Sequence, residues 1–346
     1  MKDFKKLKIL EIVKEKQGLS SQEIHSHIIS QMSYSTVKRI LSHLISEKLV
    51  QSIGTGKATK YQISSTYQLL YHIDLKTYFE KEIDDREIKA TFNHQLMTDI
   101  LYNVKLFNDD ELQKLNLLQE KYKTNIAELT KHEYLKELER LAIDLSWKSS
   151  QIEGNTYSLL ETERLLKEKE TASGKTLDEA VMLLNHKAAL DFILENPDYV
   201  TPMKISSIED IHSILIKDLG VDRNIRKRKV GITGTNYYPL DNQQQIIEAM
   251  EDMCKLINTR TNIFEKALLV LVLLSYIQPF GDGNKRTARI ISNAVLIANG
   301  YCPISFRSVD SIDYKKAMLV FYEQNNISAF KEIFISQFQF AVNTYF

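Results

Sequence analysis

The chain has 346 residues, carries 45 basic and 45 acidic side chains, and is 43% apolar. Its length supports two or three domains with sizeable cores. Five prolines and eleven glycines argue against long disordered tracts. The longest apolar run, residues 267–277, falls short of the roughly twenty residues that span a bilayer, and the charged start lacks a signal-peptide core. We therefore expect a cytoplasmic protein without a membrane span.

Charge is distributed unevenly along the chain. Residues 1–65 hold eleven Lys and Arg against five Asp and Glu, a net charge of +6, so the other residues carry −6. A basic segment on a mildly acidic body indicates a local contact with a polyanion.

Three helices and a hairpin are predicted for residues 1–65. Apolar residues at helical spacing over 4–13 predict a first helix, which Gly18 ends. Ser20 or Ser21 can cap a second helix over about 22–30, and Ser33 can cap a third that carries an apolar face from 37 to 45. Two short alternating segments, 50–53 and 59–63, are joined by "GTGKA", whose glycines suit a hairpin turn.

This pattern resembles a winged helix-turn-helix domain over its full length. In that family the third helix enters the major groove of DNA and the wing rests on backbone phosphate. The resemblance implies DNA contacts from the start of the third helix and from the wing, through Tyr34, Ser35, Thr36, Lys38, Arg39, Lys57 and Lys60. The alternative is that these are solvated side chains on a module used for protein contacts.

The rest of the chain predicts a mainly α protein. Residues 66–108 look helical, carry no recognisable chemistry and are interpreted as a connector, and residues 109–346 read as many helices with short loops. Two motif candidates fail. "SGKT" at 173–176 lacks the first glycine of a phosphate-binding loop, and "KHEYLKE" at 131–137 lacks the second histidine of a zinc-protease helix.

The stretch "SYIQPFGDGNKRTARI", residues 275–290, has the composition of a phosphate site. Pro279 and two glycines force a turn between two helical patterns, which leaves N–H groups at the start of the second helix free to bind an anion. Arg286 and Arg289 share one helical face and can reach the same anion. Asp282 is placed to hold a divalent ion that bridges phosphates.

The same stretch resembles the Fic family signature, His-x-Phe-x-(Asp/Glu)-Gly-Asn-(Gly/Lys)-Arg-x-x-Arg, over residues 278–289. Only the first position departs from it, where Gln278 stands in place of histidine. "VGITGTNYYP", within about 229–240, resembles the β-hairpin flap that docks a target segment over the active site; its residues of interest are Gly231, Thr233, Gly234 and Tyr237. "SSQIEGN" at 149–155 resembles the family's inhibitory helix motif, with Ser149, Glu153 and Gly154 in register.

The resemblance implies an all-α Fic fold that binds ATP with Mg²⁺ and transfers AMP to a hydroxyl of a target protein, or of the chain itself. By that analogy Asp282 would bind the metal, and the nucleotide would be held by Gly283, Asn284, Lys285, Arg286 and Arg289. Glu153 would pair with Arg289 and displace the γ-phosphate; the plainer reading of Glu153 is a surface acid in a loop. A homodimer is left open.

Gln278 leaves the activity undecided. The family histidine takes the proton of the attacking hydroxyl, whereas an amide does not titrate, a loss that typically costs about 10²–10⁴-fold in rate. A glutamine can still orient a hydroxyl. An impaired protein adenylyltransferase held off by Glu153 is one reading, and an ATP-sensing DNA-binding regulator with an inactive Fic domain is the alternative. Hydrolytic removal of AMP ranks last. The nearest histidine in the sequence is His212.

Overall fold

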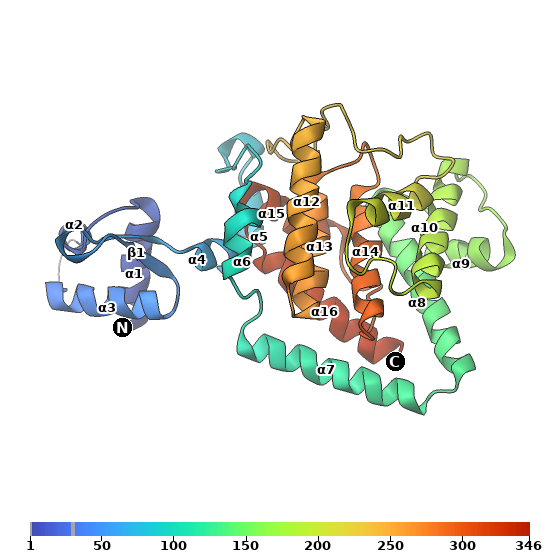
Figure 1. Cartoon of the computed structure of the whole chain (residues 1–346), viewed down its shortest axis with the longest axis horizontal. Helices are drawn as coiled ribbons and strands as arrows, with labels where there is room; N and C mark the ends of the chain where they lie inside the picture. The colour runs from blue at the N-terminus through green and yellow to red at the C-terminus, as the bar shows by residue number, and fades with distance from the viewer. Residues whose placement is uncertain (1, 29–31) are drawn as a thin grey trace. The chain divides into compact units, whose positions relative to one another are not determined.

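The computed structural model describes residues 2–28 and 32–346, and the chain divides into two compact units, Met1–His72 and Ile73–Phe346. We call them the amino-terminal and carboxy-terminal units and describe each by itself. Helices dominate, and the described residues form a single two-stranded sheet (Figure 1), which confirms the predicted mainly α class.

The amino-terminal unit folds as a three-helix domain with a wing. Its elements are α1 (Lys2–Glu15), α2 (Ser21–His27), α3 (Tyr34–Ser46), β1 (Val50–Ile53), β2 (Lys60–Ile63) and α4 (Ser65–Leu70). Ser20 caps α2 through a capping box with Glu23, and Ser33 caps α3, because each hydroxyl accepts an otherwise unpaired N–H. The second helix ends at His27; residues 29 and 30 of its predicted span lie outside the described residues.

The wing turn depends on one glycine. β1 and β2 pair antiparallel with Val50 opposite Ile63. At Gly54 φ is +79°, and a Cβ there would lie 2.8 Å from the carbonyl oxygen of Ala58. Residues 56–58 form a 3₁₀ turn at the tip. The core beneath joins all three helices to both strands, through Ile9, Val13, Ile24, Val37, Leu41, Leu44, Val50 and Ile63.

Residues 73–108 are less helical than predicted. They contain α5 (Leu75–Glu80), a 3₁₀ turn (Ile83–Asp85), a π-helical turn (Leu96–Ile100) and α6 (Leu101–Asn103). The intervening backbone bonds to distant elements instead of to itself: Lys89 N–H donates to the carbonyl oxygen of Glu323, and Asn93 N–H donates to the Tyr276 hydroxyl.

The remaining helices are α7 (Asp109–Glu128), α8 (Lys131–Ile152), α9 (Leu159–Glu168), α10 (Leu177–Glu195), α11 (Ile205–Leu215), α12 (Gln243–Thr259), α13 (Ile263–Ile277), α14 (Asn284–Ala298), α15 (Ser311–Gln324) and α16 (Ser328–Thr344). The predicted apolar run forms α13, which is buried from residue 267 to 277 and packs against α12, α14, α15 and α16 (Figure 1). On its other sides α14 contacts α8, α10 and α11. The end of α13 and the start of α14 therefore meet inside the bundle.

The predicted β-hairpin over residues 229–240 is not formed. The segment, which we call the flap segment, is irregular, and its single bridge joins Tyr238 in parallel to Thr91. Its polar backbone groups bond elsewhere: Tyr238 N–H donates to the Ala90 carbonyl oxygen, and the Gly234 carbonyl oxygen accepts from Arg86. These contacts replace a strand ladder.

Among the described residues, none of the helices combines the length and apolar character needed to cross a membrane.

Candidate functional site

The loop between α13 and α14 is braced by its own residues. Gln278 and Gly283 both adopt left-handed backbone conformations, with φ of 52° and 78°. The Asn284 side chain accepts from Phe280 N–H at 2.9 Å and donates to the Phe280 carbonyl oxygen at 2.9 Å. It also donates to Oε1 of Gln278 at 3.0 Å. Asn284 therefore holds the loop shape from within.

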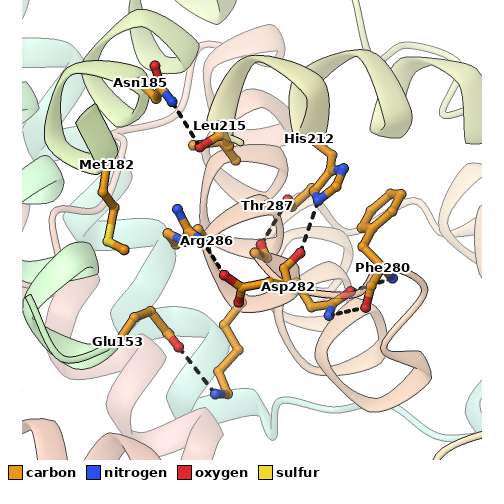
Figure 2. A network of polar contacts seen from close by, with 12 residues as sticks. Glu153, Met182, Asn185, His212, Leu215, Phe280, Asp282, Arg286 and Thr287 are labelled. Carbon is orange, nitrogen blue, oxygen red and sulfur yellow. Dashed lines mark hydrogen bonds and ion pairs between the residues drawn. The ribbon is translucent and has the colours of Figure 1, made fainter. Parts of the chain in front are cut away.

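His212 of α11 supports the loop from behind. Its ring stacks on Phe280 with centroids 3.6 Å apart, and its Nε2 donates to the Asp282 carbonyl oxygen at 3.0 Å. In Figure 2, His212 and Arg286 approach Asp282 from different sides. A Cβ on Gly283 would lie 3.2 Å from Ile216 and 3.4 Å from His212, so only glycine fits without displacing them. The loop is packed too closely to change shape freely.

The start of α14 is open to an anion. Gly283 is the N-cap residue and makes no side-chain capping bond, so the first N–H groups of the helix lack that partner. They point out of the helix end, where the helix dipole adds positive potential. A cavity of about 400 Å³ lies against this end.

Five segments line that cavity: the end of α8, the flap segment, the loop, the start of α14, and α15. The lining residues are Ile152, Glu153, Val230, Gly231, Ile232, Thr233, Gln278, Gly281, Asp282, Gly283, Asn284, Lys285, Lys315, Met318, Leu319 and Tyr322. Eight of these were predicted from the sequence. The structure thus gathers residues from positions about 170 apart in the chain around one hollow.

Glu153 sits between two cations at the cavity wall. Its Oε1 lies 2.9 Å from Nη2 of Arg289 and its Oε2 lies 3.3 Å from Nζ of Lys285 (Glu153 is labelled in Figure 2). Arg289 also donates to Oγ of Ser149 at 2.8 Å and to its carbonyl oxygen at 3.0 Å. Burial favours a raised pKa for Glu153, but Arg289 and Lys285 outweigh it and lower the pKa below 4.5. Glu153 is therefore ionised at neutral pH.

Both arginines of the predicted clamp are buried and have unused donors. Arg286 pairs with Asp282 at 3.0 Å, yet its Nε and Nη1 have no hydrogen-bond partner among the described residues, nor has Nη1 of Arg289. His186 of α10 is fully buried beside them with both ring nitrogens unpaired in the described part of the chain. Burial, then Arg289 and Arg286, depress its pKa well below 6.5, so the ring is neutral.

The Gln278 amide is engaged at both ends. Its Nε2 donates to the Ser275 carbonyl oxygen at 2.7 Å, and its Oε1 accepts from Asn284. His212 does not stand in for a titrating group here, because it faces the back of the loop and does not line the cavity.

Asp282 is the acid available to a metal at the cavity, and 64% of its side chain is exposed. The described residues contain no group of three His, Cys, Asp or Glu side chains arranged to hold an ion. Magnesium commonly binds through one or two carboxylates together with substrate phosphates and water. Asp282 fits an ion that arrives with a nucleotide.

Several predicted residues lie away from the cavity lining. Tyr237 is 1% exposed, donates to the Tyr276 carbonyl oxygen at 3.1 Å and stacks on its ring, so it belongs to the core. The Gly234 carbonyl oxygen accepts from Arg86, and Gly154, which follows the C-cap residue of α8, has a φ of 101°. Ser149 is buried against Arg289.

Sequence reasoning missed the α15 wall. Lys315, Met318, Leu319 and Tyr322 recur at helical spacing, which was the available signal, but nothing local indicates that this face meets the loop. It also missed Arg226, which is buried and donates to the Gln278 carbonyl oxygen at 2.6 Å.

In the amino-terminal unit the predicted DNA-contacting residues lie on α3 and the wing. Ser35, Lys38, Arg39, Lys57 and Lys60 are exposed, and Tyr34 and Thr36 are half-buried. The Tyr34 hydroxyl lies 2.9 Å from Oγ of Ser21, and Nζ of Lys38 lies 5.1 Å from the centre of its ring. Arg39, Lys57 and Lys60 are thus available to a polyanion.

Family models match both units. The Fic/DOC family model matches residues 202–296, and the penicillinase repressor model matches residues 5–115. The chain is 30% identical over 174 residues to a protein adenylyltransferase Fic of Nematostella vectensis, covering 48% of this chain and 40% of that protein. It is 29% identical over 201 residues to a protein adenylyltransferase Fic of Aedes aegypti, covering 56% of this chain and 38% of that protein. The chain thus spans about two fifths of the length of these relatives.

Solved structures share the fold. A fragment of Fic-1 from C. elegans superposes with a TM-score of 0.60 at 19% identity, covering 68% of this chain and 72% of that one. A Fic domain containing signaling protein from Bacteroides thetaiotaomicron superposes with a TM-score of 0.58 at 22% identity, covering 66% of this chain and 94% of that one. The chain carries a Fic/DOC family domain, preceded by a winged helix domain of the penicillinase repressor type.

Proposed function

We propose that the carboxy-terminal unit binds ATP in the cavity at the start of α14 and acts as a Fic-type protein adenylyltransferase, transferring AMP to a hydroxyl of a target protein. One observation carries the proposal: a single cavity brings together an open helix N-terminus, the exposed carboxylate of Asp282 and an acid held on Arg289. The relatives named protein adenylyltransferase support the reaction class.

The chemistry follows from the charges around the cavity. The helix N-terminus and Lys285 line the cavity and would hold the α-phosphate. Arg286 and Arg289 do not line the cavity, so their buried, unused donors would serve the outer phosphates only once Glu153 is displaced. Asp282 would hold the magnesium ion that accompanies the nucleotide, which neutralises phosphate charge. A target hydroxyl oxygen would then form a bond to the α-phosphorus, the bond to the bridging oxygen would break, pyrophosphate would leave, and the hydroxyl proton would pass to water.

The hydroxyl proton has no acceptor at residue 278. Gln278 does not titrate, and its Oε1 is already occupied by Asn284, so its role is limited to orienting groups in the cavity. We therefore propose slow turnover, with nucleotide binding retained.

Glu153 supplies a second restraint. Its carboxylate occupies Nη2 of Arg289 and repels an incoming phosphate, so ATP must displace it. We propose that this pair holds the unit in an inhibited state.

Four proteins test the proposal: the natural chain, Glu153→Gly, Gln278→His and the double variant. Each is titrated with Mg²⁺–ATP by calorimetry and then incubated with ATP labelled on its α-phosphate, alone and with a cell extract. Glu153→Gly should bind ATP more tightly, and the double variant should label protein about 10²–10⁴-fold faster than Glu153→Gly alone. A double variant that binds ATP and labels nothing would refute the transfer reaction. Absence of ATP binding in all four would refute the nucleotide site.

A second function is favoured by the amino-terminal unit: regulation of transcription in response to ATP. The exposed Arg39, Lys57 and Lys60 and the match to a repressor family support DNA binding. A gel shift on the DNA upstream of its own coding sequence should weaken as salt rises and change when ATP is added. A shift that is indifferent to ATP would remove the sensing role.

A further inference from the structure

We propose that Arg226 is a positioning residue that fastens both ends of the flap segment to residue 278, so that the flap segment and the phosphate-binding loop move as one body. This proposal rests on the proposed function only for its effect on ATP. Arg226 lies just before the flap segment and is 6% exposed.

The guanidinium of Arg226 reaches three separate carbonyl oxygens. Its Nε donates to Gln278 at 2.6 Å, its Nη1 donates to Arg228 at 2.9 Å, and its Nη2 donates to Leu240. Arg228 and Leu240 lie at the entry and the exit of the flap segment. The main-chain N–H of Arg226 also donates to the Pro279 carbonyl oxygen at 2.9 Å. One side chain thus closes the base of the flap segment and ties it to the loop.

The positive charge of the buried Arg226 side chain is compensated by the dipoles of carbonyl groups. Gln278 is the C-cap residue of α13, where the helix dipole is negative and the last carbonyl groups lack helical partners. No ion pair of Arg226 with an acid occurs among the described residues; nearby Asp241 pairs with Lys229 at 3.1 Å. A cation that forks to three carbonyls suits this end of α13, and only arginine has a rigid fork with enough donors.

Two features make this clamp consequential. The flap segment has no strand ladder of its own, so contacts with other segments, including those of Arg226, hold it in place. Gln278 adopts a left-handed conformation that residues other than glycine rarely keep unless their surroundings impose it. Arg226 binds the carbonyl oxygen of that residue, and rotation of the 278–279 peptide would pull on the flap base. Val230 and Gln278 both line the cavity, so one clamp sets two of its walls.

Hydrogen exchange measured by mass spectrometry tests the clamp without requiring any activity. The variants are Arg226→Met, Arg226→Lys and, as a matched control, Arg228→Met, which removes an exposed arginine of the same segment and keeps its carbonyl group. Arg226→Met should speed exchange about tenfold or more in both 229–240 and 278–284, with α7 and α16 unchanged. Arg226→Lys should restore little, since an ammonium group cannot reach all three oxygens. Arg228→Met should match the natural protein.

The result that would overturn the proposal is faster exchange in the flap segment alone, or equal exchange in Arg226→Met and Arg228→Met. If Arg226→Met exchanges faster throughout the unit, Arg226→Gln is measured in its place, and a uniform increase there too would reduce Arg226 to a residue needed for folding. ATP titrations of the same samples are read separately: Arg226→Met should bind ATP more weakly than Arg228→Met. If the natural chain binds no ATP, the proposed function fails. The hydrogen-exchange result still shows whether Arg226 couples the flap segment to the loop.

Discussion

Replacing Glu153 with glutamine should weaken the folded protein and strengthen its hold on ATP. The substitution keeps the shape of the side chain and removes its charge. Arg289, which is fully buried, then keeps its bonds to Ser149 but loses its charged partner, and Lys285 loses the same partner. The carboxylate is replaced by a neutral amide beside two cations, so the folded state without ligand loses a charge-assisted contact.

The magnitude follows from the geometry. Glu153 makes one contact at 2.9 Å to a buried guanidinium and a longer one at 3.3 Å, and 21% of its side chain is exposed. A hydrogen bond to a charged group contributes about 1.5–3 kcal/mol, so we expect the free energy of unfolding to fall by about 2 kcal/mol. For a unit of this size that lowers the melting temperature by about 3–4 °C. Because ATP no longer has to displace the carboxylate, its affinity should rise about tenfold, the equivalent of about 1.4 kcal/mol.

Thermal unfolding with and without Mg²⁺–ATP measures both effects in one experiment. The matched control is Glu163→Gln, which makes the same chemical change in an exposed pair with Lys167, and such pairs contribute little. Without ATP, Glu153→Gln should have a lower melting temperature than the natural chain. Adding ATP should raise its melting temperature by more than it raises that of the natural chain or of Glu163→Gln. If it melts at the same temperature as Glu163→Gln, or gains no more from ATP, the reasoning about Arg289 is wrong.

Three further predictions concern other buried or exposed charges. His186 is held neutral, so the unfolded chain binds a proton below pH 6.5 that the folded chain does not; stability should fall by about 1 kcal/mol from pH 6.5 to 5.5 on this account. Denaturant titrations at both pH values should show that the free energy of unfolding of His186→Phe falls by about 1 kcal/mol less between pH 6.5 and 5.5 than that of the natural chain. An equal fall in the two proteins would contradict a neutral ring. Arg86 pairs at 3.5 Å with Glu323, which is fully buried, so Arg86→Met should cost about 3 kcal/mol. Arg86→Met with Glu323→Gln should recover part of that loss in chemical denaturation, and no recovery would mean that the pair does not matter. Lys57→Gln should reduce the salt dependence of DNA binding by about one unit of log–log slope, measured by fluorescence anisotropy. An unchanged slope would place Lys57 away from phosphate.

The sequence predicted features that depend on neighbouring residues. The caps at Ser20 and Ser33 and the apolar helix over 267–277 were readable because each follows from a few residues close together. The open helix start at Gly283 was readable from the glycines and the resumed helical pattern. The ion pair between Glu153 and Arg289 was accessible only through the resemblance to a family motif, since 136 residues separate the two.

Features that depend on distant partners could not be read from the pattern. The resemblance to a family segment places Tyr237 in the flap, but its burial depends on a stack with Tyr276, 39 residues further along the chain. Arg226 resembles any lysine or arginine of its basic stretch until the end of α13 is folded beside it. His186 lies on a helix with no pattern that marks it, and its lowered pKa arises first from burial and then from two arginines on another helix.

The most direct test of the central claim is calorimetric titration of Glu153→Gly with Mg²⁺–ATP, beside the natural chain. We predict one ATP per chain, with at least about tenfold tighter binding to the variant, because Arg289 is then free for phosphate. Equal affinity in the two proteins would contradict the role given to Glu153. No binding to either would contradict a nucleotide site at the start of α14.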